Sequence, residues 1–205
     1  MTVRLSRVER KTRTRAELIR AARAVFLRRG FHGASLDEIA EEAGYTKGAV
    51  YSNFAGKDDL YLALLEAHYE ERADAYIAMM LDEPSFDDAI RAVGRFMAEA
   101  DAREPDWLPT LAEFVAHAAR DESVRRSYVA VRERFLTAIA DVIEALCLRH
   151  GLTLRVPPLE AARASSVLAR GFSAERRLDP HAVSSDTFVE LHAAFMRGLT
   201  LPREE

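Results

Sequence analysis

The chain of 205 residues is 49% apolar and 30% charged, which is the composition of an ordinary globular protein. Its one cysteine, Cys147, excludes an internal disulfide and fits a reducing compartment. The longest stretch without a charged side chain is nine residues, 48–56, far short of a membrane span, and the N-terminus holds no apolar signal-peptide core. We therefore expect a cytoplasmic protein that has no membrane partner.

The net charge of −4 conceals an uneven distribution along the chain. Residues 1–55 carry eleven Lys and Arg against six Asp and Glu, whereas residues 56–205 carry eighteen against 27. A basic N-terminal part on an acidic body can attract a polyanion locally, although a solvated basic tail would look the same. The basic residues before Thr12 either contact nucleic-acid phosphates or a minor groove, or they form a disordered tail; they are Arg4, Arg7, Arg10 and Lys11.

The apolar spacing predicts helix almost throughout, with no strand-type alternation. A first helix is expected at 13–29, ended by Gly30. Ser35 and Glu38 form a capping-box pattern that begins a short second helix, which ends before Gly44. Further helices are expected between Pro, Gly and polar breaks, at 46–53, from about 57–59 onward, and at 85–102, 106–119, 122–149, 158–177 and 184–199. These elements predict an all-α protein of about nine helices.

The segment 44–60, GYTKGAVYSNFAGKDDL, combines a turn with an uncharged helix face. Ala40, Gly44 and Val50 have the spacing that a helix-turn-helix needs, with a small contact residue, a residue that tolerates positive φ, and an apolar wedge. An uncharged surface with lysines at its rim suits a helix in a DNA major groove, because phosphates line the groove edges and hydrogen-bonding base edges form its floor. An ordinary three-helix core with a half-buried Tyr51 would need neither the paired glycines nor this face.

Residues 12–72 resemble the DNA-binding domain of the TetR (tetracycline-repressor-like) family of bacterial transcription regulators, with the helix-turn-helix at 35–54. The matching stretch is AARAVFLRRGFHGASLDEIAEEAGYTKGAVYSNFAGKDDLYLALLE, and its most specific part is Thr46-Lys47-Gly48-x-x-Tyr51-x-x-Phe54-x-x-Lys57. The resemblance implies DNA contacts along this run and a buried anchor at Phe54. The candidate DNA-binding residues are Ser35, Thr46, Lys47, Gly48, Ala49, Tyr51, Asn53 and Lys57.

Residues 73–205 are expected to form a ligand-binding and dimerisation domain, as the resemblance implies from the fragments LAEFVAHAARDESVRRSY and GFSAERRLDP. Aromatic and polar residues gather in its middle segments, where they either line a largely apolar cavity for a small molecule or simply form core. The candidate pocket residues are Phe96, Met97, Trp107, Phe114, His117, Tyr128 and Phe135.

The last two expected helices each carry an apolar stripe. Paired with their symmetry mates, they would form an isologous four-helix interface, whereas the alternative is that they cover only the core of their own chain. The candidate interface residues are Leu168, Phe172, Phe188, Leu191 and Phe195.

An enzymatic role has little support in the sequence. Glu113 and His117 stand one helical turn apart, but no Glu-x-x-His or His-x-x-x-His motif completes a metal site around them. We therefore expect no metal, no cofactor and no catalysis. The sequence predicts a homodimeric repressor that binds a palindromic double-stranded DNA operator and is released by a small hydrophobic effector. The alternative is a helical ligand sensor that acts through a protein partner without binding DNA.

Overall fold

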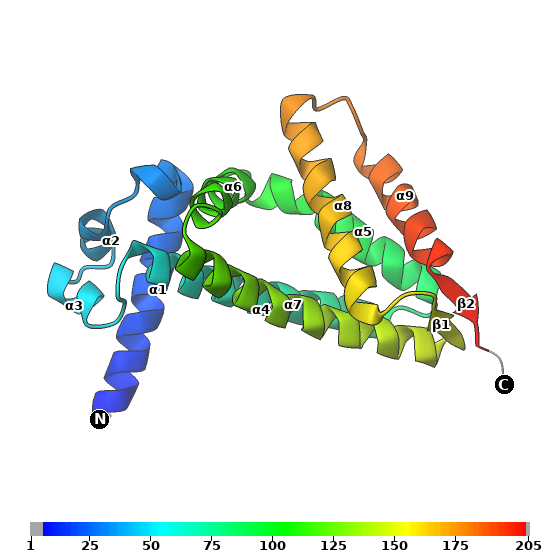
Figure 1. Cartoon of the computed structure of the whole chain (residues 1–205), viewed down its shortest axis with the longest axis horizontal. Helices are drawn as coiled ribbons and strands as arrows, with labels where there is room; N and C mark the ends of the chain where they lie inside the picture. The colour runs from blue at the N-terminus through cyan, green and yellow to red at the C-terminus, as the bar shows by residue number, and fades with distance from the viewer. Residues whose placement is uncertain (1–5, 204–205) are drawn as a thin grey trace. The chain divides into compact units, whose positions relative to one another are not determined.

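The computed structural model describes residues 6–203, and within them all side chains except those at 81 and 100–102. Figure 1 shows that this part of the chain is helical, and the predicted all-α class is confirmed. Its helices are α1 (Arg7–Gly33), α2 (Leu36–Glu42), α3 (Lys47–Tyr51), α4 (Lys57–Asp82), α5 (Phe86–Arg103), α6 (Trp107–Ala118), α7 (Glu122–Arg149), α8 (Pro158–Leu178) and α9 (Ser185–Gly198).

The chain divides into two compact units, and the division differs from the predicted boundary after residue 72. Unit 1 comprises residues 1–68 and 109–131, and unit 2 comprises 69–108 and 132–205. The helix-turn-helix segment therefore shares its unit with most of α6 and the start of α7, which the sequence assigns to the C-terminal domain. The long helices α4 and α7 each begin in unit 1 and end in unit 2.

Unit 1 is built on an aromatic core. The rings of Phe26 and Tyr61 meet edge to face with centroids 5.0 Å apart, and Tyr61 stacks on Phe114 at 4.3 Å. Leu18 and Val50 are also fully buried, so α1 and α3 both contribute apolar side chains to the interior of the unit. This burial fixes which face of α3 is left for solvent.

Helix α1 begins earlier than predicted, at Arg7 rather than at residue 13. Ser6 caps it, because the Glu9 N–H donates to Ser6 Oγ at 3.2 Å while the Ser6 N–H donates to Glu9 Oε2 at 2.7 Å. This capping box was not predicted from the sequence. Residues Arg7, Arg10 and Lys11 are therefore helical and exposed rather than a disordered tail, whereas Arg4 lies outside the described residues.

Unit 2 has a largely aliphatic core, with Met80, Ile90, Leu136, Ile143 and Met196 among its buried residues. Helices α5 and α9 approach closely, because Gly94 has no side chain and a Cβ there would lie 3.4 Å from Val189 Cα. Helices α8 and α9 lie side by side in Figure 1, and the ring of Phe172 stacks on Phe188 with centroids 4.1 Å apart.

Unit 2 also contains a short antiparallel ribbon that the sequence reading missed. Strand β1 (Leu152–Leu154) pairs with β2 (Thr200–Pro202), with Thr153 opposite Leu201. Three residues are too few to show the alternation of apolar and polar side chains that marks a strand. The pairing is therefore visible only in the structure, where β1 follows α7 and β2 follows α9. Among the described residues, no helix is long and apolar enough to cross a membrane.

Candidate nucleic-acid interface

The turn between α2 and α3 has the geometry that the sequence predicts. Gly44 adopts φ 70°, which only glycine enters without strain, and the Tyr45 N–H donates to the Ala40 carbonyl at 2.9 Å. Ala40 is 3% exposed and Val50 is fully buried, so the small contact residue and the apolar wedge are both in place. Helices α2 and α3 are thereby held as a helix-turn-helix.

A polar chain ties this turn to α1. The Tyr45 hydroxyl donates to Glu17 Oε2 at 2.5 Å, and the Thr14 hydroxyl donates to the Tyr45 hydroxyl at 3.4 Å. The bond from Tyr45, followed by the bond from Arg13, lowers the pKa of Glu17, so this carboxylate stays charged. Because Tyr45 directly precedes Thr46, the N-cap of α3, these bonds fix the position at which that helix starts.

Both short helices begin at a side-chain cap. The Glu38 N–H donates to Ser35 Oγ at 3.1 Å, and the Ala49 N–H donates to Thr46 Oγ1 at 3.3 Å. The predicted return bond from Glu38 to Ser35 is replaced, because the Glu38 carboxylate accepts instead from Arg28 and Arg29 at 3.2 and 3.1 Å. Ser35 and Thr46 remain exposed, and each capping hydroxyl keeps its proton as a donor for an anion.

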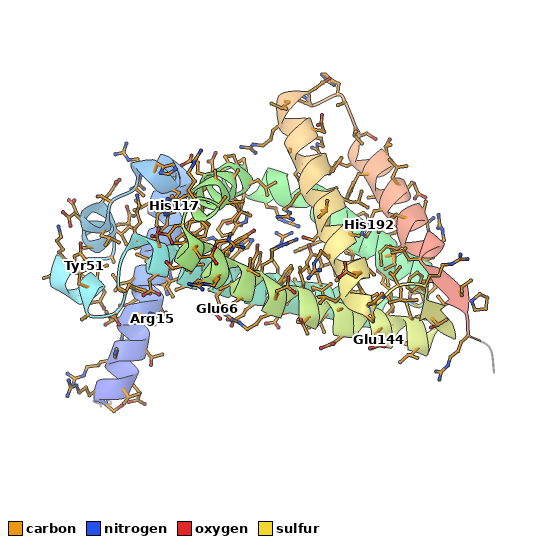
Figure 2. All side chains as sticks on the ribbon, in the orientation of Figure 1. Arg15, Tyr51, Glu66, His117, Glu144 and His192 are labelled. Atoms are coloured by element: carbon orange, nitrogen blue, oxygen red, sulfur yellow. The ribbon has the colours of Figure 1, made fainter. Side chains whose placement is uncertain are left out.

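The outer face of α3 is open to solvent. Tyr51 is 52% exposed, and Figure 2 labels it on this short helix. A Cβ added at Gly48 would meet nothing closer than Thr46 Oγ1 at 3.8 Å, so the backbone there is accessible. The face therefore combines a bare backbone, a phenol and a helix N-terminus.

The two predicted lysine contacts are both engaged within the protein. Lys47 Nζ lies 2.8 Å from Asp37 Oδ1 on α2, and this hydrogen bond raises the pKa of the lysine. Lys57 Nζ donates to the His32 and Ala34 carbonyls at 3.3 and 3.2 Å. Lys57 thus binds the C-terminal end of α1, a role that the sequence reading missed.

Asn53, the last polar candidate of this segment, folds back on α3. Its Nδ2 donates to the Ala49 carbonyl at 2.8 Å, and the backbone carbonyl of Asn53 accepts from Arg15 Nη1 at 2.9 Å. The Arg15 guanidinium also lies 4.3 Å from the centre of the Phe54 ring, which is 2% exposed. Phe54 is therefore buried, as the family resemblance implies. The sequence reading missed Arg15, whose only signal was its place on the inner side of the first helix.

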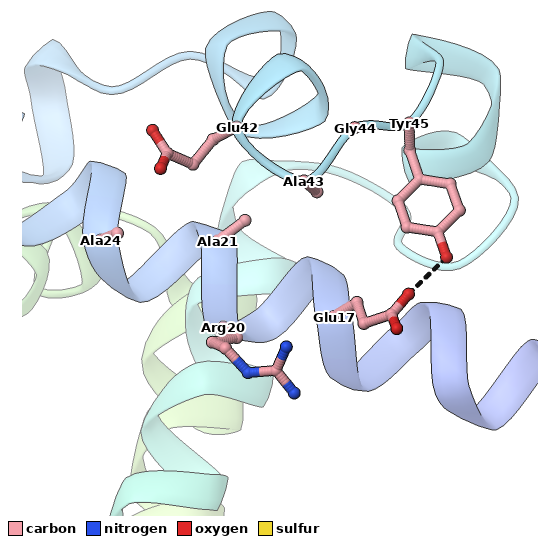
Figure 3. Close-up of a pocket in the computed structure, with 8 residues that line it drawn as sticks. All are labelled: Glu17, Arg20, Ala21, Ala24, Glu42, Ala43, Gly44 and Tyr45. Atoms are coloured by element: carbon pink, nitrogen blue, oxygen red, sulfur yellow. Dashed lines mark hydrogen bonds between the residues drawn. The ribbon is translucent and has the colours of Figure 1, made fainter.

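A shallow hollow of about 590 Å³ lies beside the helix-turn-helix, between α1 and the end of α2 (Figure 3). None of the predicted effector residues lines it. Its walls include the bonded pair of Glu17 and Tyr45, and the full lining is Glu17, Arg20, Ala21, Ala24, Glu42, Ala43, Gly44 and Tyr45.

Three of the predicted effector residues belong to unit 1. Phe114 is fully buried among the rings of Phe31, Tyr61 and Tyr128, and Tyr128 is 8% exposed. His117 lies 3.1 Å from Asp58 Oδ1 at the start of α4, measured from its Nε2 (Figure 2). Within unit 1 these side chains are therefore core and connecting residues.

The other four lie in unit 2, where they occupy different depths. Trp107 is 7% exposed, whereas Phe96, Met97 and Phe135 are only partly buried against the aliphatic core. Phe135 stacks on Tyr69 with centroids 4.6 Å apart. These three partly buried side chains leave apolar surface at the edge of the core.

The predicted interface residues separate into two groups. Leu168 on α8 and Leu191 on α9 are 41% and 61% exposed. Phe172 and Phe188 stack on each other and are buried within their own unit, and Phe195 packs against its core. The exposed stripe thus consists of aliphatic side chains, while the aromatic ones cover the core of their own chain.

No group of three or more His, Cys, Asp or Glu side chains that could hold a metal ion occurs in the described part of the chain. Ser165 Oγ and His192 Nε2 are 2.7 Å apart, but both residues are buried. Cys147 is also buried, and desolvation raises the pKa of its thiol to about 11.

Residues 18–64 match the profile described as "Bacterial regulatory proteins, tetR family". The activator FasR of Mycolicibacterium smegmatis is 46% identical over 67 residues, which are 33% of this chain and 29% of FasR. The regulator SrpR of Pseudomonas putida is 30% identical over 156 residues, covering 75% of this chain and 68% of SrpR. Only the second of these alignments spans two thirds of the relative.

A solved structure of a TetR-family regulator from Mesorhizobium loti has the same fold. It superimposes with a TM-score of 0.72 and 23% identity, over 92% of this chain and 96% of the other. The match therefore extends through both units, whereas the sequence match to FasR covers only a third of this chain.

Proposed function

Because the chain belongs to the TetR family of bacterial regulatory proteins, we propose that it is a homodimeric cytoplasmic repressor that binds a palindromic operator and is released by a small, largely hydrophobic effector. The exposed face of α3 supports this proposal most directly. It presents Gly48 and Tyr51 beside the capped N-terminus at Thr46, with charged groups only at its edge. Such a face can approach the floor of a major groove without burying an unpaired charge.

In the complex, the N-terminus of α3 enters the groove, where Thr46 and Lys47 meet base edges and Tyr51 meets a phosphate. Ser35, at the start of α2, donates its hydroxyl proton to a second phosphate. Lys57 holds the end of α1 through the His32 and Ala34 carbonyls and so positions the helix-turn-helix. It also contacts a phosphate at the edge of the face.

A second copy of the chain supplies the second half-site. Adjacent major grooves on one side of DNA repeat about every 34–36 Å, so a two-fold dimer can place two α3 helices in them. The exposed Leu168 and Leu191 on α8 and α9 provide the apolar surface for this association.

The effector binds in unit 2, at the apolar edge that Phe96, Met97 and Phe135 form. Methionine and ring faces adapt to apolar molecules of several shapes. A coupling of about 1–3 kcal/mol between effector and DNA would lower operator affinity by roughly 5- to 150-fold. The coupling is reciprocal, so operator DNA must weaken effector binding by the same factor.

The proposal is tested by titrating a fluorescent duplex, selected by the protein from a random pool, at several salt concentrations. We expect two chains per duplex and an affinity that falls steeply with salt. Tyr51→Ala should weaken binding by about 5- to 10-fold, because one hydrogen bond to a phosphate is lost. Leu201→Ala, on β2 in unit 2, is the matched control and should bind normally. A folded protein that binds no duplex but still binds apolar ligands would instead be a sensor that acts through a protein partner.

A further inference from the structure

Lys47, the lysine assigned above to base reading, is held by an acidic residue of the neighbouring helix. Its Nζ lies 2.8 Å from Asp37 Oδ1 and 2.9 Å from Asp37 Oδ2, so the ammonium bridges both oxygens. Both side chains are more than half exposed, at 57% for Lys47 and 62% for Asp37. The pair therefore lies on the same open surface as the face that is proposed to meet DNA.

Asp37 is the acidic residue of α2 that is directed at α3. Glu38 and Glu42 on the same helix instead accept from Arg28, at 3.2 and 3.0 Å, and Glu38 also accepts from Arg29. Asp37 lies in the first turn of α2, where the helix dipole favours a negative charge. Its carboxylate thus lies at the position that Lys47 reaches.

On the premise of the proposed function, we propose that Asp37 is a specificity-determining residue that competes with DNA for the ammonium of Lys47. Any complex in which Lys47 contacts DNA must first break its bond to Asp37. At a matching site, a base acceptor replaces both carboxylate contacts. On random DNA the ammonium meets no matching base edge and only phosphates compete for it, so Asp37 keeps Lys47 from adding to the binding. Asp37 therefore weakens random binding more than operator binding.

The magnitude of the competition follows from the exposure of the pair. Exposed ion pairs contribute little and are screened by salt, because water competes for both partners. We therefore expect a weak restraint that changes affinity by about 2- to 5-fold at low salt and disappears near 1 M salt. A restraint of this size adjusts selectivity without preventing binding.

A double-mutant cycle tests the competition, with Asp37→Asn, Lys47→Met and the combined variant titrated against the selected duplex and a random duplex. Asp37→Asn should strengthen random-DNA binding by about 2- to 5-fold and operator binding by less. In the Lys47→Met background, only the general effect of removing one negative charge should remain. Glu41→Gln measures that general effect, because it removes an exposed charge from the same helix and should act equally in both backgrounds.

A measurement on the DNA-free protein identifies the pair independently. The NMR titration of the Lys47 ammonium should shift to lower pH in Asp37→Asn and stay unchanged in Glu41→Gln. If the wild-type protein binds DNA but the effects of Asp37→Asn and Lys47→Met on DNA affinity are additive, the proposed role of Asp37 is wrong and the proposed function still stands. If the wild-type protein binds no DNA, both the proposed function and the role of Asp37 in specificity are wrong. This holds even if the Lys47 titration shifts in Asp37→Asn as expected.

Discussion

The two units bury their apolar residues in different ways. In unit 1 the rings of Phe26, Phe31, Tyr61 and Phe114 contact one another with centroids between 4.3 and 6.0 Å apart, and all four are at most 1% exposed. In unit 2 the interior is mainly aliphatic, and aromatic side chains such as Phe96 and Phe135 lie at its edge. The first core is filled by large rings, whereas the second leaves ring surface uncovered.

This difference shows why a list of aromatic residues from the sequence does not define a pocket. A ring that is enclosed by other rings has no face left for a ligand, so its loss damages the fold. A ring at the edge of an aliphatic core still has an open face, so a ligand can contact it without displacing neighbouring side chains. Phe114 and Tyr128 of unit 1 are therefore enclosed core residues, whereas Phe96 and Phe135 of unit 2 are the aromatic candidates that keep a partly open ring.

The largest effect on stability is expected from truncating Phe114, whose ring packs α6 into the aromatic core of unit 1. Phe114→Ala should lower the free energy of unfolding by about 3–5 kcal/mol, because it opens a cavity among fixed rings. Phe135→Ala, at the edge of the other core, should cost only about 1–2 kcal/mol, since part of that ring already faces water. Urea denaturation of both variants measures the difference, and equal losses would contradict the distinction between the two cores.

A smaller effect is expected from His192, which Figure 2 labels on α9. Burial lowers its pKa from 6.5 to about 4, so the folded state binds fewer protons than the unfolded state between these values. Its contribution to stability is complete above pH 6.5 and is lost as the pH falls toward 4, reaching about 2 kcal/mol of loss at pH 5.

The check is to measure unfolding free energies at pH 7.5 and pH 5 for the wild type and for His192→Asn. The variant should lose about 2 kcal/mol less than the wild type on acidification. His181→Asn, which removes an exposed histidine between α8 and α9, should keep the full pH dependence. If His192→Asn keeps it as well, the buried histidine is not its source.

The smallest effect is expected at Cys147, a buried thiol in the aliphatic core. Because burial raises its pKa to about 11, it stays protonated near neutral pH and should resist alkylation in the folded protein. Iodoacetamide should label one thiol per chain in urea and almost none without it, as mass spectrometry would detect. Cys147→Ala should cost about 1 kcal/mol and leave DNA binding unchanged. Rapid labelling of the folded protein would instead mean that the thiol is accessible.

The sequence predicted the features that depend on residues close together in the chain, such as turns, helix caps and helix boundaries. The glycine at the α2–α3 turn and the cap at Ser35 are found where short-range rules place them, and Phe54 is buried as the family resemblance implies. The cap at Thr46 was not predicted, although the start of a helix there was. The nine helices of the described chain follow the Pro and Gly breaks to within a few residues, except at the start of α1.

The features that the sequence could not predict depend on partners distant in the chain. Lys57 is bonded to carbonyls more than twenty residues away, and a lysine in a basic region looks the same whether it faces a phosphate or a helix end. Phe114 and Phe135 carry the same side chain, and only the three-dimensional packing separates core from edge. The β1–β2 ribbon joins segments nearly fifty residues apart and is too short for any periodicity.

The bend in α1 at Gly30 has a consequence for any redesign of this protein. The residue adopts φ 72°, and a Cβ built there would lie 2.6 Å from Glu113 Oε1, while Glu113 Oε2 accepts from the His32 N–H at 3.1 Å. A side chain at position 30 would therefore be strained by the backbone conformation and would also displace the Glu113 carboxylate of α6. Shortening Glu113 would remove only the second obstacle, because the positive φ of Gly30 would still strain any other residue. Substitutions in this part of α1 should therefore leave Gly30 in place.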